Sequence, residues 1–324
     1  MPVTLNKRAV FISNEEVVSV SDMKSYIEVI ERAYANYGEK KTVDFQRQSL
    51  WVEVENQPKR SLKLMAAATP AENALGGYIY SGGYRHQRGW QKCFILFDFT
   101  QGDLRAVIES EHMSWLKTGA VSAVAAKYLS RENAKTVCLF GAGKQAVTQL
   151  EGLCRVRQIK TVKVYSRTES SRKEFCDRMT GKLGIDVIPA NSPQEAIRGA
   201  EIVVAATTSK VPVFDGKWLQ EGMHVNAIGA HYPETRELDE VALRGHKVVV
   251  DLMDSVQESG EFCLSGFEEK DIFAELPDVV TGKKPGRELP TEITVFKSGG
   301  KGFENMALAS HVYRKLMGQT NKER

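Results

Sequence analysis

The chain has 324 residues, of which 42% are hydrophobic, so it can bury a sizeable core and is long enough for two domains. Its 44 Lys and Arg residues nearly balance its 41 Asp and Glu residues, and the net charge of +3 is spread along the chain, which argues against a nucleic-acid partner. The N-terminal segment lacks the pattern of a signal peptide, and no apolar run reaches the roughly 18 residues of a membrane span. We therefore expect a cytoplasmic protein without a membrane partner.

Cysteine and histidine usage argues against metal chemistry. The five cysteines are odd in number and widely spaced, which predicts neither a disulfide framework nor a zinc site. The six histidines are scattered, without the His-x-x-x-His spacing or the clustered acidic residues of common metal sites. We therefore expect no metal ion in the functional site.

The first third of the chain predicts a helix followed by a largely antiparallel sheet. Apolar residues recur at helical spacing from Met23 to Tyr34, directly after Asp22, a candidate N-cap. From about residue 43 to 108 the pattern changes to short apolar segments separated by turn residues, which is typical of antiparallel strands. The clearest candidate strands are residues 49–52, 62–65, 77–80 and 93–97.

The remainder of the chain predicts the α/β class. Residues 112–130 give a helix signal dominated by small residues that allow close packing. Strands and helices then alternate, which implies a doubly wound parallel sheet of the Rossmann type with right-handed crossovers. A last helix, residues 305–317, is expected to return to the first domain. The predicted strands are residues 136–140, 161–165, 186–189, 201–206, 224–228 and 247–251, and the predicted helices between the first four are residues 144–157, 169–183 and 192–199.

A glycine-rich loop stands where a dinucleotide site would form, between a predicted strand and a predicted helix. Gly141 permits a tight turn, Gly143 lets the backbone approach a pyrophosphate, and Ala146 allows the helix to pack closely on the strand. The alternative is a glycine-rich turn that binds nothing. The position of the motif inside a βαβ unit favours the dinucleotide site.

The end of the next predicted strand indicates which dinucleotide binds. An NAD-selective site usually places Asp or Glu there for the ribose hydroxyls, but this chain has Ser166, Arg167 and Thr168. Arg167 can pair with a 2′-phosphate, and the two hydroxyls can donate hydrogen bonds to it. The alternative is an exposed arginine near the start of a helix. We expect NADP(H) as the preferred cofactor, with NAD(H) as the alternative.

Several further stretches have recognisable sequences: Lys117–Leu129, the loop from Gly141 to Ala146, Val225–Ala230, Arg236–Asp239, Ser259–Glu261, Phe273–Leu276 and Thr294–Ser298. Together they resemble the ornithine cyclodeaminase and μ-crystallin family, and the likeness runs over most of the chain from about Asp44. Members of that family are ketimine reductases, amino-acid dehydrogenases or ornithine cyclodeaminases.

The resemblance implies a division of the chain into two domains and a homodimer. Residues 116–303 would form the dinucleotide-binding Rossmann domain. Residues 1–115 and 304–324 would form a substrate-binding and dimerisation domain, completed by the C-terminal helix. The residues expected to bind the cofactor are Thr118, Gly141, Ala142, Gly143, Lys144, Gln145, Ala146, Ser166, Arg167, Thr168, Thr207, Thr208, Ala227 and Gly229.

The family's chemistry is hydride transfer between the nicotinamide and the α-carbon of an amino or imino acid, whose carboxylate is held by cationic side chains. The matching positions for carboxylate binding are Arg47, Lys63 and Lys117, and Lys301 adds a further cation. Lysine keeps the charge of the arginine usual at positions 63 and 117 but loses its planar two-pronged grip. Tyr78 stands near the place of the family's catalytic lysine, so Tyr78 or Lys63 is the expected proton donor.

One departure from the family bears on the reaction. Cyclodeaminases place an aspartate where this chain has His231, which disfavours ornithine cyclisation. His231 could instead act as a general acid, or it could be a surface loop histidine. The polar segment 84–90 could likewise cover the substrate or be a solvated loop.

These features lead to one principal hypothesis and two alternatives. The principal hypothesis is an NAD(P)H-dependent reductase that converts an imino acid or a cyclic ketimine, formed from a keto acid and an amine, into an L-amino acid. The loss of the usual lysine and arginines gives weight to a non-catalytic NADPH-binding protein resembling μ-crystallin. The second alternative is an ammonia lyase of the ornithine cyclodeaminase type.

Overall fold

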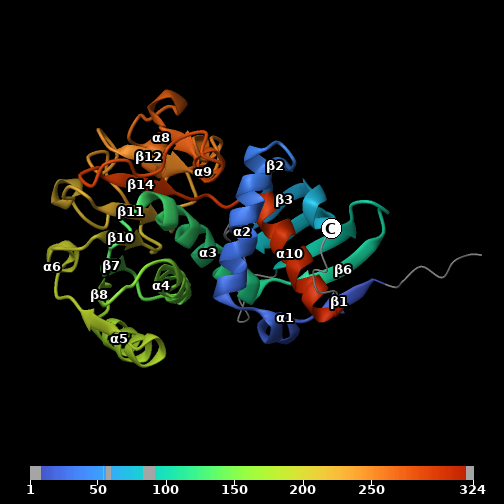
Figure 1. Ribbon diagram of the computed structural model, residues 1–324, viewed down its shortest axis with the longest axis horizontal. Helices are drawn as coiled ribbons and strands as arrows, with labels where there is room; N and C mark the ends of the chain where they lie inside the picture. Colours follow the sequence, from blue (N-terminus) through green and yellow to red (C-terminus); the bar gives the residue numbers. More distant parts are fainter. Residues whose placement is uncertain (1–8, 54, 56–59, 83–91, 319–324) are drawn as a thin grey trace, which may run out of the picture. The chain divides into compact units, whose positions relative to one another are not determined.

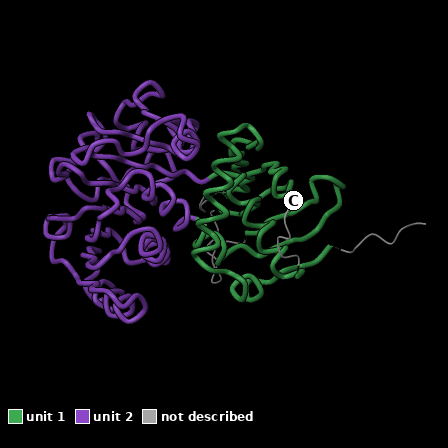
Figure 2. Tube along the Cα trace, viewed as in Figure 1, with its two compact units in different colours: residues 1–117, 301–324 green, residues 118–300 purple. Residues whose placement is uncertain are grey.

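The computed structural model describes residues 9–53, 55, 60–82 and 92–318. The chain divides into two compact units: unit 1 contains residues 1–117 and 301–324, and unit 2 contains residues 118–300 (Figure 2). Each unit is built on a sheet of its own. None of the helices in the described part of the chain is both long and apolar enough to cross a bilayer.

Unit 1 contains the predicted antiparallel sheet, in the order β1-β6-β5-β4-β3-β2. Neighbouring strands from β2 to β6 are antiparallel, and β1 is parallel to β6. β1 has three residues, too few to give a recognisable sequence pattern. The strands are β1 (Val10–Ile12), β2 (Val43–Val52), β3 (Arg60–Thr69), β4 (Ala74–Gly82), β5 (Lys92–Asp98) and β6 (Leu104–Glu109).

Helices from both ends of the described chain meet in unit 1 (Figure 1). α2 (Met23–Gly38) begins after Asp22, whose side chain accepts the N–H of Ser25, so the predicted N-cap is confirmed. α10 (Gly302–Leu316) contacts α2 and strands β2 to β5. α10 begins earlier than predicted, at a glycine whose Cβ would lie 2.6 Å from the carbonyl oxygen of Ala66. A short helix, α1 (Asn14–Val20), precedes α2.

Unit 2 is the doubly wound Rossmann-type sheet, in the order β13-β12-β14-β11-β10-β7-β8-β9, with every neighbouring pair parallel. The predicted fold class is therefore confirmed. β13 and β14 were not predicted, and β14 lies between β11 and β12. The strands are β7 (Thr136–Phe140), β8 (Thr161–Tyr165), β9 (Asp186–Pro189), β10 (Ile202–Ala205), β11 (His224–Ala227), β12 (Lys247–Val250), β13 (Ala274–Glu275) and β14 (Thr294–Lys297).

The sheet of unit 2 separates two apolar cores. Along β7, Val137 and Leu139 pack into one core, whereas Cys138 and Phe140 pack into the other. Alternate residues of a strand point to opposite faces, so a continuous apolar run supplies both cores. The helices of the unit are the later part of α3 (Glu111–Leu129), α4 (Lys144–Val156), α5 (Glu169–Leu183), α6 (Pro193–Ile197), α7 (Ser255–Glu258), α8 (Gly260–Cys263) and α9 (Leu276–Val280).

Glycines bring α3 and α4 unusually close together. A Cβ on Gly119 would lie 2.3 Å from the carbonyl oxygen of Thr148, and a Cβ on Gly152 would lie 2.6 Å from that of Gly119. The small side chains within the segment 112–130 therefore permit the close packing of α3 that the sequence predicts. This contact fixes α4, which begins at the glycine-rich loop.

Candidate active site

Unit 2 has a pocket at the carboxyl ends of its central strands, where open α/β sheets bind their ligands. Its volume is about 760 Å³. The loops after β7, β8, β10 and β11 supply most of the lining. The lining residues include thirteen at positions named from the sequence: Thr118, Gly141, Ala142, Gly143, Lys144, Gln145, Ser166, Arg167, Thr168, Thr207, Thr208, Gly229 and His231.

The glycine loop has the geometry that a pyrophosphate requires. Gly141 has φ +110°, a conformation that favours glycine, and a Cβ there would lie 2.5 Å from the carbonyl oxygen of Ala206. Gly143 is the N-cap of α4, and a Cβ there would meet nothing within 4 Å. The N-terminus of α4 thus lies at the pocket, where an anion site would need its N–H groups.

Two of the expected cofactor residues do not line this pocket. Ala146 is buried in a core beneath α4, which agrees with its predicted role in packing the helix on the sheet. Ala227 is buried at the end of β11. Each is adjacent in the chain to a residue that lines the pocket, Gln145 and Ile228 respectively.

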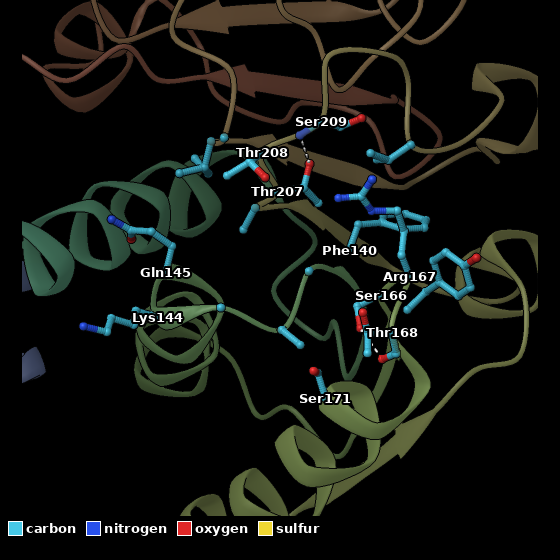
Figure 3. A pocket seen from close by; sticks show the side chains of 18 of the residues that line it. Phe140, Lys144, Gln145, Ser166, Arg167, Thr168, Ser171, Thr207, Thr208 and Ser209 are labelled. Atoms are coloured by element: carbon cyan, nitrogen blue, oxygen red, sulfur yellow. Dashed lines mark hydrogen bonds between the residues drawn. The ribbon is translucent and has the colours of Figure 1, made fainter. Parts of the chain in front are cut away.

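The wall after β8 is basic and hydroxylic. Figure 3 shows Ser166, Arg167 and Thr168 together on one side of the pocket, with Lys144 pointing away from them. Arg167 is exposed, and the carbonyl of Ser166 accepts a hydrogen bond of 2.7 Å from Arg172. The described residues that line the pocket include no Asp or Glu. This composition suits a negatively charged ligand.

The opposite wall is held by a residue that the sequence did not single out. Glu237 is fully buried behind the pocket, and it accepts hydrogen bonds from the N–H groups of Thr207 and Gly229, both at 2.6 Å. His231 lines the pocket two residues after Gly229. A glutamate in the segment Arg236–Asp239 gives no sequence signal of its burial, because acidic residues are usually exposed.

In unit 1, two of the expected site residues, Lys63 and Tyr78, share the inner face of the sheet. Lys63 pairs with Tyr80 across β3 and β4, and Met65 pairs with Tyr78, so these side chains lie on one face. Lys63 is 4% exposed, and its Nζ lies 5.2 Å from the ring centroid of Trp51 and 5.7 Å from that of Tyr80. Such aromatic contacts stabilise a buried cation.

Tyr78 lies in an aromatic stack on that face. Its ring centroid is 5.0 Å from that of Tyr80 and 4.7 Å from that of Phe94, and its hydroxyl lies 3.2 Å from Oγ of Ser114. Burial raises the pKa of Tyr78 to about 12, although hydrogen bonding to Ser114 and the nearby charge of Arg47 oppose the rise. The phenol therefore keeps its proton throughout the neutral range.

Lys117 is paired with a carboxylate that the sequence analysis missed. Its Nζ donates to Oε2 of Glu304 at 2.7 Å, and the hydroxyl of Tyr34 donates to Oε1 at 2.5 Å. The N–H of Lys301 also donates to Oε2, at 3.0 Å, and Lys301 is itself 2% exposed. The available signal was an acidic residue within the apolar sequence of α10. The segment 84–90, a candidate cover for the substrate, lies outside the described residues.

The parallel sheet, the glycine turn and the anion-compatible pocket define a Rossmann-type protein with a dinucleotide site. The chain belongs to the ornithine cyclodeaminase/mu-crystallin family, whose model matches residues 7–320. The resemblance inferred from the sequence is therefore confirmed over nearly the whole chain.

Similar proteins cover most of this chain. The Delta(1)-pyrroline-2-carboxylate reductase of Bacillus cereus is 33% identical over 318 residues, 95% of this chain and 97% of that protein. The ketimine reductase mu-crystallin of Mus musculus is 35% identical over 257 residues, 78% of this chain and 79% of that protein. The structure of Thermococcus litoralis Delta(1)-pyrroline-2-carboxylate reductase in complex with NADH and L-proline has a TM-score of 0.89 and 33% identity, and it covers 95% of this chain and 98% of that one.

Proposed function

We propose that this protein is an NAD(P)H-dependent reductase that converts an imino acid or cyclic ketimine into an L-amino acid, and that it prefers NADPH. The observation that carries the proposal is the pocket of unit 2, which combines the glycine turn at Gly141 with an arginine, and no acid, at the end of β8. Relatives that cover most of the chain are named for the reduction of cyclic imines.

The cofactor preference depends on Arg167 alone. The similar structure from Thermococcus litoralis contains NADH, so membership of the family does not decide between the two dinucleotides. An exposed guanidinium that lines the pocket can pair with a 2′-phosphate, whereas the ribose hydroxyls of NADH offer it no charge partner. Ser166 and Thr168 supply hydroxyl donors beside it.

Unit 1 is proposed to bind the substrate. Lys63 and Lys117 are buried cations that can pair with the α-carboxylate of an imino acid. The charge of Lys117 is already balanced by Glu304, and Lys63 lies beside the rings of Trp51 and Tyr80. When bound, the reduced nicotinamide supplies a hydride to the α-carbon of the imine.

Tyr78 is better suited to holding the imine than to supplying its proton. A phenol whose pKa is about 12 is poorly matched to proton transfer near pH 7, although it can donate a hydrogen bond to the imine nitrogen. We therefore assign Tyr78 to positioning the imine, and Lys63 stays the other candidate for the proton donor.

The experiment that tests this function is an NADPH-oxidation assay followed by absorbance. The substrates are preformed Δ1-pyrroline-2-carboxylate and Δ1-piperideine-2-carboxylate, and pyruvate and oxaloacetate mixed with ammonia or methylamine. We expect turnover with at least one of them, and lower kcat/KM with NADH than with NADPH. No NADPH oxidation with any of these substrates would contradict the reductase assignment. Ammonia release from ornithine with catalytic NAD+ would support a cyclodeaminase instead.

Arg167→Ala and a matched variant test the cofactor preference. Arg178→Ala removes another exposed arginine of the same region, on α5, which does not line the pocket. Arg167→Ala should lower kcat/KM for NADPH and spare NADH, and Arg178→Ala should spare both. Equal kinetics with NADPH and NADH in the unmodified protein would contradict the preference.

We also propose that the chain forms a homodimer through the outer face of the unit 1 sheet. Cross-strand pairing places Val43, Phe45, Leu50, Leu62 and Leu75 on one face, and each side chain is at least 41% exposed. An apolar sheet face of this kind is typical of a protein–protein interface. A similar structure, the archaeal alanine dehydrogenase with NAD, is a dimer. Light scattering on the unmodified protein and on Leu50→Glu should give a dimer and a monomer respectively, and a monomeric unmodified protein would refute this.

A further inference from the structure

One buried carboxylate joins the loops after β10 and β11. Oε1 of Glu237 accepts hydrogen bonds from the N–H of Thr207 at 2.6 Å and from its hydroxyl at 2.7 Å, and Oε2 accepts one from the N–H of Gly229 at 2.6 Å. The carbonyl of Glu237 also accepts the N–H of Val213 at 2.8 Å. Thr207, Val213 and Gly229 all line the pocket. A single residue thus sets the spacing of the two loops that form this wall.

Two further buried charges hold Glu237 in place. Oε1 of Glu261 accepts the N–H of Glu237 at 2.8 Å, and Oε2 of Glu261 lies 3.4 Å from Nζ of Lys297. Lys297 also donates to the carbonyl of Ala230 at 2.5 Å, within the loop after β11. All three charged side chains are at most 1% exposed. Such a group is held rigidly, because any member left without its partners would be a buried unpaired charge.

The hydrogen bonds require Glu237 to act as an acceptor at both oxygens. Burial raises its pKa, and the charge of Lys297 and the donors on Thr207 and Gly229 oppose that rise. Both backbone N–H groups are obligatory donors, one at each oxygen, so the ionised carboxylate satisfies them and a side-chain amide cannot. The nearly isosteric substitution Glu237→Gln therefore removes one of the hydrogen bonds that connect the two loops.

The strand order indicates which half of a dinucleotide this wall contacts. A dinucleotide with its pyrophosphate on the Gly141 loop extends in both directions along the edge of the sheet. β8, which ends at Arg167, lies on one side of β7, whereas β10 and β11 lie on the other. If the adenosine ribose lies at Arg167, the nicotinamide half lies over Thr207 and Gly229.

We propose that Glu237 is a positioning residue for the nicotinamide half of the bound cofactor. Glu261, paired with Lys297, holds the backbone N–H of Glu237, and the carboxylate of Glu237 fixes Thr207 and Gly229 at the spacing which that half of the ligand requires. This inference rests on the proposed function, since it needs a nicotinamide dinucleotide in the pocket. It adds a residue behind the pocket wall that controls one half of the ligand and not the other.

The test compares a whole dinucleotide with its adenosine half. Isothermal titration calorimetry measures the Kd of NADPH and of 2′,5′-ADP for the unmodified protein and for Glu237→Gln. We expect Glu237→Gln to weaken NADPH at least about tenfold, as for a lost charged hydrogen bond, and to leave 2′,5′-ADP within about twofold. If the unmodified protein prefers NADH, the pair of ligands becomes NADH and ADP.

Glu201→Gln is the matched control at the opposite edge of the same sheet. Glu201 precedes β10, and its Oε2 accepts the N–H groups of Lys135 at 2.7 Å and Thr136 at 3.0 Å. Its Oε1 pairs with Arg131 at 3.0 Å. It therefore accepts two backbone N–H groups, as Glu237 does, although it is only half-buried and pairs with Arg131, and it does not line the pocket. Both affinities should be unchanged in this variant.

Each outcome decides the inference. A parallel loss of both ligands in Glu237→Gln, or no loss of NADPH, overturns it. If that variant fails to fold, Glu261→Gln replaces it, with a smaller loss expected for NADPH alone and the same overturning results. If the unmodified protein binds no dinucleotide at all, the proposed function fails, and the inference fails with it.

Discussion

Replacing His224 with glutamine should flatten the acid sensitivity of the protein. His224 is fully buried on β11, where Nδ1 lies 2.9 Å from Oγ1 of Thr294 and Nε2 lies 3.0 Å from Oδ1 of Asn226. Burial, reinforced by the positive charge of Arg287, lowers the pKa of His224 to about 3. Glutamine has a donor and an acceptor for the same partners and carries no titratable group.

The sign and size of the effect follow from proton linkage. In the unfolded chain this histidine has its ordinary pKa of 6.5, so below that pH the unfolded state binds a proton that the folded state rejects until about pH 3. The stability contributed by the neutral histidine is complete above pH 6.5 and is lost as the pH falls. Between pH 7.5 and 5.0 the loss is about 2 kcal/mol, or roughly 4 to 8 °C in Tm.

Circular dichroism melts at pH 7.5 and 5.0 measure this difference. The drop in Tm between the two pH values should be smaller in His224→Gln than in the unmodified protein by that amount, whatever the variant's stability at pH 7.5. His311→Gln is the companion variant in unit 1, where burial lowers the pKa of His311 to about 4, and it should give a reduction in the same direction. An identical drop in His224→Gln and in the unmodified protein would refute the reasoning.

Three further predictions concern single contacts. Arg167→Ala should lower kcat/KM for NADPH by about tenfold or more, as expected for a lost charge-assisted contact, and change the NADH value little; an unchanged ratio in steady-state assays would contradict the role of Arg167. Glu304→Gln removes the negative charge that balances the buried Lys117 and should reduce the free energy of unfolding by about 3 kcal/mol, seen as a lower urea midpoint; an unchanged midpoint would show that the ion pair contributes nothing. Gly119→Ala places a Cβ 2.3 Å from the carbonyl of Thr148 and should destabilise by about 1–3 kcal/mol, whereas Gly181→Ala, with nothing within 4 Å, should be neutral or stabilising by up to about 1 kcal/mol; equal melts of the two variants would argue against a tight crossing of α3 and α4.

The sequence predicts helices and strands correctly where an apolar pattern is long or where a capping or turn residue marks the end of the element. β7 has its predicted limits because a continuous apolar run ends at Gly141, and α2 begins where Asp22 offers a cap. β14 has four residues after a long polar stretch, so its place between β11 and β12 depends on partners distant in the chain. Local pattern carries no information about such pairing.

Some residues of the candidate site can likewise be predicted from the sequence, and others cannot. Lining positions such as Gly141 and Arg167 follow a strand in sequence, so the motif alone places them at the edge of the sheet. Glu237 and Glu304 matter through contacts with residues far away in the chain, and nothing in their neighbourhood identifies those partners. The chemical roles of Arg167, Lys63, Tyr78 and His231 stay predictions until the assays above are made.

The late position of two elements has a consequence for biosynthesis. β14 (Thr294–Lys297) separates β11 from β12, and α10 (Gly302–Leu316) contacts four strands of the unit 1 sheet. The sheet of unit 2 cannot reach its final form before β14 has left the ribosome, and the sheet of unit 1 cannot be covered before α10 has left it. Long-range pairing of this kind is slow to form and leaves strand edges exposed meanwhile. A nascent chain that stalls before residue 294 should therefore be a substrate for chaperones, and premature termination before that residue should prevent both units from completing their folds.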